Sequence, residues 1–395
     1  MISRDRKRAV ARRAIAPTDI YKWPNLSFDG AGSLGTGKVF IGSIDPDARP
    51  LEFDHLVFTD SSRGSFNCRC FALSPDGTLL AASFDTTTAL VWRLSDGLLV
   101  QRLQDQGHTN LILSVVFSPD TRHLVSGSLD KTTIIWDIKS GRALLQLQGH
   151  RDAARTIAYS PDGSRIATGS DDRSVKIWDA SSGACLHSLN LGERVHKVIF
   201  SPNSARLAAK LSNTGAICDV QSGTRITTLQ HKGSERMRLS LSQQGDRVIT
   251  GTQDGTAKIW SAVTGEELLE LNDHMHMINC VAFSPDGAEV ATVSDDRAVV
   301  ICDSWTGLRR RVYRLSSAAR SVVYSPKGEY IAMDDAGGRV RVCDARSGGF
   351  VAEFEGHTAP VEELQFLPDG RSLLSHSYIN KTVRLWSIRD MMQLH

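Results

Sequence analysis

The sequence predicts an all-β chain in which a four-stranded antiparallel sheet is copied eight times and the copies form a ring. Three observations predict it: a turn signal that recurs at a nearly constant interval, a closing residue that recurs in phase with it, and alternating apolar and polar residues between the two. Helical periodicity is sustained nowhere along the 395 residues. The repetition therefore overrides the two or three separate domains that chain length alone would suggest.

The turn signal is Ser-Pro-Asp-Gly or a variant of it, and its first residue recurs every 41 to 44 residues. The eight copies of that residue are Ser74, Ser118, Ser160, Ser201, Ser242, Ser284, Ser325 and Leu367. The closing residue recurs every 40 to 44 residues, as Trp92, Trp136, Trp178, Cys218, Trp260, Cys302, Cys343 and Trp386. Two markers in phase over most of the chain indicate eight units.

Each unit contains three clear strand candidates and usually a fourth. In the third unit they are residues 154–160, 165–170, 174–179 and 184–190, separated by turns rich in Gly, Pro, Asp and Ser. Alternation at a period of two and β-branched residues favour antiparallel strands. One such sheet cannot bury both of its faces, but radial stacking buries each sheet against its neighbours and leaves only short edges.

These units resemble WD-repeat β-propellers in their spacing, in the Gly-His before several units and in the closing Trp-Asp. The resemblance covers roughly residues 60 to 395. It implies a single eight-bladed β-propeller of four-stranded antiparallel blades, with the ring closed by an N-terminal strand that pairs with the last blade and so removes two open edges. Residues 51–58 and, alternatively, 39–44 are the candidates for that strand.

In this family, a His before the first strand, a Ser or Thr on the second, an Asp in the next turn and the closing Trp form a hydrogen-bonded set. The resemblance assigns two complete sets: His108, Ser128, Asp130 and Trp136, and His150, Ser170, Asp172 and Trp178. The sixth unit has the polar residues but closes on Cys302, while the fourth and seventh units lack the His and Asp. We therefore expect these residues to be structural, neither catalytic nor metal-binding.

The seven cysteines form no CxxC pair, and their number is odd. A disulfide framework or a Cys-rich zinc site is not expected, and a reducing compartment is indicated. At Cys218, Cys302 and Cys343 a thiol stands where other units have an indole, so packing as a small apolar side chain is expected there.

Residues 1–38 are expected to be a basic, Gly-rich, disordered segment, and residues 39–395 the propeller. The first 17 residues are basic without a signal-peptide apolar core. The alternatives to a solvated tail are a nuclear-localisation or nucleic-acid patch and an Arg-rich presequence. Residues 32–38, GSLGTGK, match a phosphate-binding loop, but Val39 stands where a Ser or Thr would hold Mg²⁺ and no helix is indicated after it. A linker is the better interpretation.

Composition and motifs restrict the function. Lys and Arg total 46 against 44 Asp and Glu, giving a net charge of +2, so no overall attraction to nucleic acid or membrane is expected. No nucleophile–base arrangement or metal motif is present in the sequence. We expect no enzymatic activity, cofactor, metal or membrane span, and a cytoplasmic or nuclear location.

Members of the family bind partners on the narrow face, the end of the ring at which the first strand of each unit begins. Transferred position by position, the resemblance places partner-binding residues at Arg69, Phe84, Leu111, Leu113, Leu129, Arg155, Asp171, Arg194, His196, Met277, Asp295 and Arg320. Apolar residues in the first two units lie beside basic ones in the third and fourth. This favours a peptide with an apolar anchor and acidic or phosphorylated residues, although the same residues could simply line a solvated channel.

The sequence thus predicts a non-enzymatic interaction scaffold or adaptor, a monomer within a larger complex, whose partners are proteins or peptides. The alternative function is that of a subunit of an RNA or chromatin assembly that uses the basic N-terminal tail. In that case binding should weaken steeply with salt.

Overall fold

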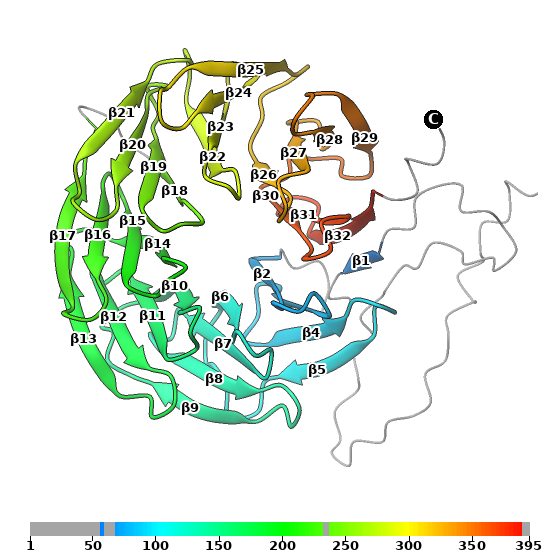
Figure 1. Cartoon of the computed structure of the whole chain (residues 1–395). Helices are drawn as coiled ribbons and strands as arrows, with labels where there is room; N and C mark the ends of the chain where they lie inside the picture. Colours follow the sequence, from blue (N-terminus) through cyan, green and yellow to red (C-terminus); the bar gives the residue numbers. More distant parts are fainter. Residues whose placement is uncertain (1–55, 59–67, 232–236, 389–395) are drawn as a thin grey trace, which may run out of the picture.

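Eight antiparallel sheets surround a central opening in the computed structural model (Figure 1), and the first strand of each sheet is the innermost. The structure describes residues 56–58, 68–231 and 237–388. These residues form 32 strands, and among them there is no helix that could cross a bilayer. The predicted all-β, eight-bladed propeller of four-stranded blades is confirmed. The predicted N-terminal segment 1–38 lies outside the described residues.

The first four blades follow one another along the chain, and each runs from its innermost to its outermost strand in sequence order. Blade one has β2 (Cys70–Leu73), β3 (Leu79–Ser83), β4 (Ala89–Arg93) and β5 (Leu99–Leu103). Blade two has β6 (Ile112–Phe117), β7 (His123–Ser128), β8 (Thr133–Asp137) and β9 (Ala143–Leu147). Blade three has β10 (Ala154–Tyr159), β11 (Arg165–Ser170), β12 (Ser174–Asp179) and β13 (Cys185–Asn190). Blade four has β14 (Val195–Phe200), β15 (Arg206–Leu211), β16 (Gly215–Asp219) and β17 (Thr224–Leu229).

The remaining blades repeat this order, except that the last one takes a strand from the other end of the chain. Blade five has β18 (Arg238–Leu241), β19 (Arg247–Gly251), β20 (Ala257–Ser261) and β21 (Glu267–Leu271). Blade six has β22 (Ile278–Phe283), β23 (Glu289–Ser294), β24 (Ala298–Asp303) and β25 (Arg309–Arg314). Blade seven has β26 (Val322–Tyr324), β27 (Tyr330–Asp334), β28 (Val340–Asp344) and β29 (Phe350–Phe354). Blade eight has β30 (Glu363–Phe366), β31 (Ser372–Ser377), β32 (Thr382–Ser387) and β1 (Leu56–Phe58).

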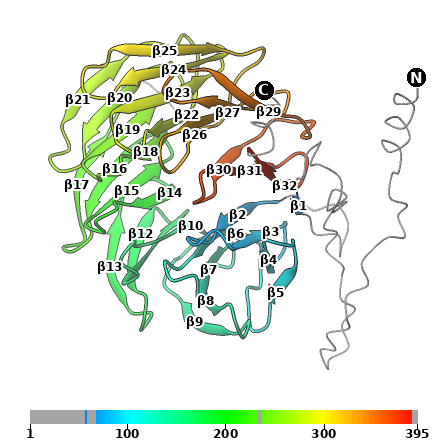
Figure 2. The same cartoon turned by 45° about the vertical axis from the view of Figure 1, so that its right-hand side comes forward.

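The strand β1 lies beside β32, and Figure 2 shows the two next to each other. They pair antiparallel, with Leu56 opposite Leu385 and Phe58 opposite Val383. The Phe58 side chain is fully buried and packs edge-on against Trp92 of blade one, 5.7 Å between ring centroids. Of the expected strand 51–58 the structure describes residues 56–58, and residues 51–55, like 39–44, lie outside the described residues. That this strand is what closes the ring stays a prediction.

The recurring serine of the turn signal organises the turn between the two innermost strands. The Ser160 hydroxyl donates to Asp162 Oδ1 at 2.6 Å and accepts from the backbone N–H of Arg165 at 2.9 Å. Gly163 has φ of +74°, a conformation that favours glycine because it has no Cβ. Ser, Asp and Gly therefore recur together because one hairpin needs all three.

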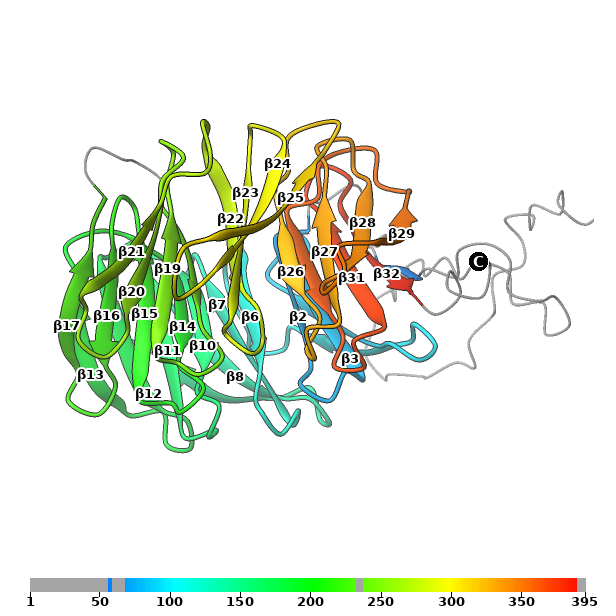
Figure 3. The same cartoon turned by 45° about the horizontal axis from the view of Figure 1, so that its top comes forward.

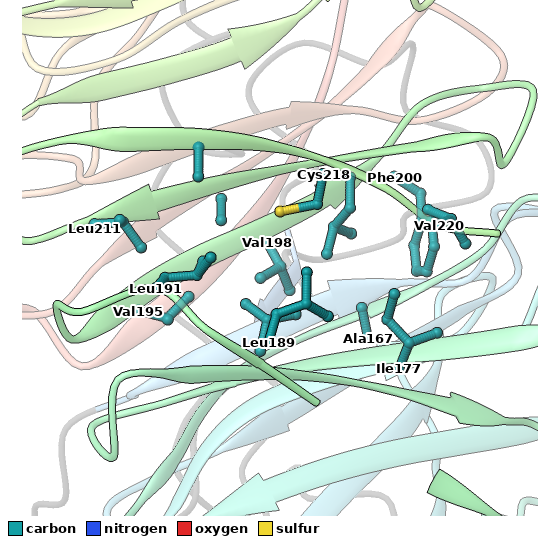
Figure 4. Packing of buried hydrophobic residues seen from close by; sticks show 14 residues of the cluster. Ala167, Ile177, Leu189, Leu191, Val195, Val198, Phe200, Leu211, Cys218 and Val220 are labelled. Carbon is teal, nitrogen blue, oxygen red and sulfur yellow. The ribbon is translucent and has the colours of Figure 1, made fainter. Parts of the chain in front are cut away.

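The closing residue of each blade packs against the preceding blade, which is how the sheets bury their second faces. Figure 4 shows Cys218 of blade four among apolar side chains such as Leu189 and Ile177 of blade three. Cys218, Cys302 and Cys343 are all buried, as expected of small apolar side chains. Burial raises the pKa of the Cys218 thiol to about 12, so this thiol is not a nucleophile at neutral pH.

The hydrogen-bonded sets exist, but the expected serines are wrong by two residues. His150 Nδ1 lies 2.9 Å from Asp172 Oδ2, and His150 Nε2 lies 2.7 Å from Thr168 Oγ1. Trp178 Nε1 donates to that same Thr168 oxygen at 2.8 Å. The hydroxyl that joins the histidine to the tryptophan therefore belongs to Thr168 and not to Ser170.

Blade two has the same arrangement. His108 lies 2.9 Å from Asp130 and 2.8 Å from the Ser126 hydroxyl, which accepts from Trp136 Nε1 at 2.7 Å. Ser128 instead donates to the backbone oxygen of Asn110 at 3.0 Å, as Ser170 does to Asp152. These two serines sit at the end of their strands, where they bond the loop before the first strand rather than the buried indole.

Two further blades carry the His–hydroxyl–Trp chain, which the sequence assignment did not include. In blade five, Thr250 Oγ1 lies 2.7 Å from His231 and accepts from Trp260 at 2.7 Å. In blade eight, Ser375 Oγ takes this place between His357 and Trp386, at 2.7 Å from each. Blade six keeps His274 and Thr292, 2.8 Å apart, but Cys302 donates to Asp273 instead.

We expect deletion of residues 1–60, which removes β1, to yield an aggregating or unfolded protein, because it exposes the edge of β32 and empties the space that Phe58 fills. Deletion of residues 1–38 alone is the matched control and should melt like the full chain. Thermal melts followed by circular dichroism measure both. A cooperative melt unchanged by the longer deletion would refute the role given to this strand.

The shared hydroxyl of blade three gives a second prediction. Thr168→Val removes the hydroxyl that His150 Nε2 and Trp178 Nε1 share, at a cost of about 1–3 kcal/mol per orphaned group, while His150 Nδ1 keeps its contact with Asp172. Urea unfolding of Thr168→Val, Trp178→Phe and the double variant should give a non-additive cycle. In contrast, Ser170→Ala should be additive with Trp178→Phe, because its hydroxyl does not contact the indole. Additivity in both cycles would contradict the assignment.

The buried histidines make stability depend on pH. Burial lowers the pKa of His357 to about 3, and it also lowers the pKa of His150 and His231. The unfolded chain takes up these protons near pH 6.5, so their stabilisation is complete above that pH and is lost as the pH falls toward 3. The free energy of unfolding should therefore decrease between pH 6.5 and 4.5, by up to about 1.4 kcal/mol per pH unit for each histidine.

His357→Gln should flatten this dependence, as measured by urea unfolding at several pH values. His276→Gln, at an exposed position, is the matched control, and its curve should run parallel to that of the wild type. If the curve of His357→Gln also runs parallel, protonation of His357 does not oppose folding.

Candidate partner-binding surface

The narrow face is built from two positions in each blade that lie sixteen residues apart. One is at the start of the innermost strand, and the other is in the turn after the second strand. In blade six, Asn279 Nδ2 donates to Asp295 Oδ1 at 2.7 Å. In blade four, His196 Nε2 lies 3.2 Å from Ser212 Oγ. The antiparallel register of the two strands brings these positions together, so each blade presents a pair rather than two independent side chains.

In blades one and three this pair is an ion pair. Arg69 bonds Asp85, and the Arg155 guanidinium donates to Asp171 through Nε at 2.8 Å. The bond from Arg155 lowers the pKa of Asp171. The positive charge of Arg155 is thus largely balanced within its own blade, which weakens its expected part in a basic sector.

The expected exposure of Phe84 is wrong, since only 1% of this residue is accessible. Its ring packs edge-on against Trp92, 6.0 Å between centroids. It occupies the place that Ser128 has in blade two, because Asp85 and not Phe84 follows Arg69 by sixteen residues. Phe84 is therefore part of the core of blade one.

Blade two presents leucines where blades one, three, four and six present polar pairs. Leu111, Leu113 and Leu129 are all partly exposed, and the backbone N–H of Leu129 donates to the Leu111 oxygen at 2.9 Å. Leu113 and Leu129 are the sixteen-residue pair of this blade. The apolar part of the predicted surface is therefore these three leucines.

The remaining predicted residues lie at equivalent positions in their own blades. Arg194 and Arg320 are exposed, and the backbone N–H of Arg320 donates to Asp334 Oδ1 at 2.9 Å. Met277 is partly exposed, and its backbone oxygen accepts from the N–H of Asp295 at 3.1 Å. Partner binding at these residues stays a prediction.

The sequence assignment missed several members of these pairs. Asp85 bonds the predicted Arg69, Ser212 bonds the predicted His196, and in blade eight the Tyr378 backbone N–H donates to Glu362 Oε2 at 2.7 Å. The signal that could have found them is the constant sixteen-residue offset, which is visible in the sequence once one pair is known.

The recurring histidines and aspartates of blades two and three are engaged in the buried sets described above. Over residues 56–58, 68–231 and 237–388, no three His, Cys, Asp or Glu side chains lie close enough to hold a metal ion.

Comparison with known proteins agrees with this architecture. The family "WD domain, G-beta repeat" matches residues 98–137, 141–179, 223–261, 265–303 and 348–387. Each matched repeat begins just before the outermost strand of one blade and ends one residue after the closing residue of the next. The five matches close blades two, three, five, six and eight, which are the blades that have the buried histidine.

Two relatives and one solved structure illustrate the likeness. The "Eukaryotic translation initiation factor 3 subunit I" of Emericella nidulans is 28% identical over 333 residues, which is 76% of this chain and 85% of that protein. The "Autophagy-related protein 16" of Arabidopsis thaliana is 26% identical over 84% of this chain and 51% of its own length. The computationally designed Ika8 protein superposes with a TM-score of 0.69 at 23% identity, covering 82% of this chain and 96% of its own.

Proposed function

Because this chain belongs to the WD-repeat family of β-propellers, we propose that it is a non-enzymatic scaffold that binds partner proteins or peptides on its narrow face. The observation that carries the proposal is that the buried polar groups and the side chains of the narrow face have different roles. Groups capable of acid–base chemistry are engaged in buried hydrogen bonds, as His150 is with Thr168 and Asp172. The narrow face presents side chains suited to binding.

The surface supports a partner with a particular chemistry. The three leucines Leu111, Leu113 and Leu129 offer an apolar patch that can receive an aliphatic or aromatic anchor. Blade three contributes an ion pair between Arg155 and Asp171, and the exposed Arg194 of blade four adds a cation whose charge acts on Asp171. A peptide with one apolar anchor followed by acidic or phosphorylated residues fits this order.

The relatives support membership of a larger complex. One of them carries the name of a subunit of a translation initiation factor, which supports protein partners within an assembly and a cytoplasmic location for this chain. The relatives' names differ, so they support the scaffold class and no single pathway. The alternative nucleic-acid assembly depends on the basic tail, outside the described residues, and we do not propose it.

The proposal is tested by affinity purification and mass spectrometry of Leu113→Glu combined with Arg194→Glu. We expect this variant to lose most of the partners that the wild type captures, because it places charge on the apolar patch and reverses the adjacent cation. The matched control is Leu144→Glu with Arg142→Glu, exposed residues near the outer strand of blade two. An unchanged partner set, with an unchanged thermal melt, would refute binding at this surface.

A further inference from the structure

One pair of directly opposed residues recurs between the two innermost strands of the blades. In blade three it is Thr156 opposite Gly169, in the register of β10 and β11. In six other blades the register places these residues opposite each other: Cys70 and Ser83, Ser114 and Gly127, Lys197 and Lys210, Arg238 and Gly251, Cys280 and Val293, and Glu363 and His376. We call this the seam pair, and in blade four alone among these it consists of two lysines.

The seam pair faces the next blade. The Thr156 hydroxyl accepts from the backbone N–H of Val198 in blade four at 3.2 Å. Arg238 Nε donates to the Asn279 oxygen in blade six at 2.7 Å. A Cβ added to Gly169 would meet Val195 Cγ1 at 2.4 Å, so the second residue of the pair also abuts the next blade. By the same geometry, Lys197 and Lys210 face blade five.

Three positively charged residues occupy the seam pairs of blades four and five. Side chains directly opposite in an antiparallel pair lie on the same face about 4.5–5.5 Å apart at Cβ, and like charges there are destabilising. Arg238, the first residue of the seam pair in blade five, adds a third cation. The charges of Lys197 and Arg238 both act on the Cys280 thiol of blade six, which places them on the same side of the opening.

The described part of the chain supplies no counter-charge for the two lysines. Within it, no hydrogen bond or ion pair reaches Lys197 Nζ or Lys210 Nζ. The charges that act on Lys210 are those of Arg238 and Lys197, and together with burial they lower its pKa to about 8. Lys197 is exposed and Lys210 is partly exposed.

Elsewhere the chain compensates its enclosed cations. Arg155 pairs with Asp171 at the narrow face. Arg247, which is buried, donates to the backbone oxygens of Ser304 at 3.0 Å and Gly287 at 2.9 Å. Lys197 and Lys210 of blade four have no such partners. Packing does not require a charge at these positions, and within the described residues nothing compensates the two charges.

We propose that Lys197 and Lys210, with Arg238 beside them, form an anion site between blades four and five for the phosphoryl group of a phosphorylated serine or threonine on a partner polypeptide. This inference rests on the narrow-face binding proposed above and names the chemistry of the partner. A phosphoryl group carries nearly two negative charges and three acceptor oxygens, which matches two lysine ammonium groups and an arginine better than a singly charged carboxylate does.

The site is continuous with the narrow-face surface. Lys197 directly follows His196, and Lys210 is followed by Leu211 and then by Ser212, the partner of His196. A partner segment whose apolar side chain lies on the leucines of blade two therefore crosses blade three to bring a phosphorylated residue to the lysines.

The test measures binding of N-acetyl-O-phosphoserine amide to the full chain by isothermal titration calorimetry, in chloride buffer of constant ionic strength. The variants Lys197→Thr and Lys210→Gly copy the seam pair of blade three and are thus compatible with the blade. We expect saturable binding by the wild type and at least about tenfold weaker binding by each variant. Lys139→Met, an exposed lysine in the β8–β9 turn, should bind like the wild type.

Two further measurements keep the result interpretable. Without the probe, Lys210→Gly should melt no lower than the wild type because it relieves repulsion, whereas a structural role would lower the melting temperature. N-acetylaspartate amide, inorganic phosphate and a short RNA hairpin are the competing ligands. The proposal would be overturned if binding of the phosphoserine probe did not saturate, or if Lys139→Met weakened that binding as much as the seam variants do. Tighter binding of any competitor would also overturn it. None of these results would contradict binding of partners at the narrow face, because that proposal is tested separately by affinity purification.

Discussion

A four-stranded sheet has two apolar faces and can cover neither by itself, and the rest of this structure depends on that constraint. The closing residue of each blade packs against the blade before it, as Cys218 does against blade three (Figure 4). The sheets are thereby joined around the opening, where Figure 1 shows β30 and the first strand of each other blade innermost, and Figure 3 shows neighbouring blades side by side. Packing alone, however, leaves the Trp Nε1–H and the neighbouring polar groups enclosed.

The hydroxyl shared by a histidine and a tryptophan meets this second requirement. In blades two, three, five and eight one Ser or Thr oxygen lies between the two rings at 2.7 to 2.8 Å. Where the closing residue is a cysteine there is no indole N–H to satisfy, so the set can be incomplete. The repeats that the family matches are instead distinguished by the buried histidine, since blade six is matched although it closes on Cys302, and blade one is not matched although it closes on Trp92.

Function is consequently left to positions that the packing does not constrain. The sixteen-residue pairs of the narrow face vary from ion pair to leucine pair without a change in the blade. The seam pairs are more restricted, because Gly127, Gly169 and Gly251 have backbone or side-chain atoms of the next blade within 3 Å of an added Cβ. A lysine at this position in blade four is accordingly a larger departure from the repeat than a lysine on the rim would be.

The sequence by itself determined the number of blades, the class of every strand and the burial of the three closing cysteines. Turns and closing residues are local signals that repeat in phase, and they specify the same hairpin and the same packing in each blade. Only the tertiary structure decided which hydroxyl bonds the indole, because Ser126 and Ser128 lie on the same face of one strand and the histidine comes from a distant loop. It likewise decided that Phe84 is core and that Asp171 balances Arg155, since both depend on which residues two strands bring opposite each other.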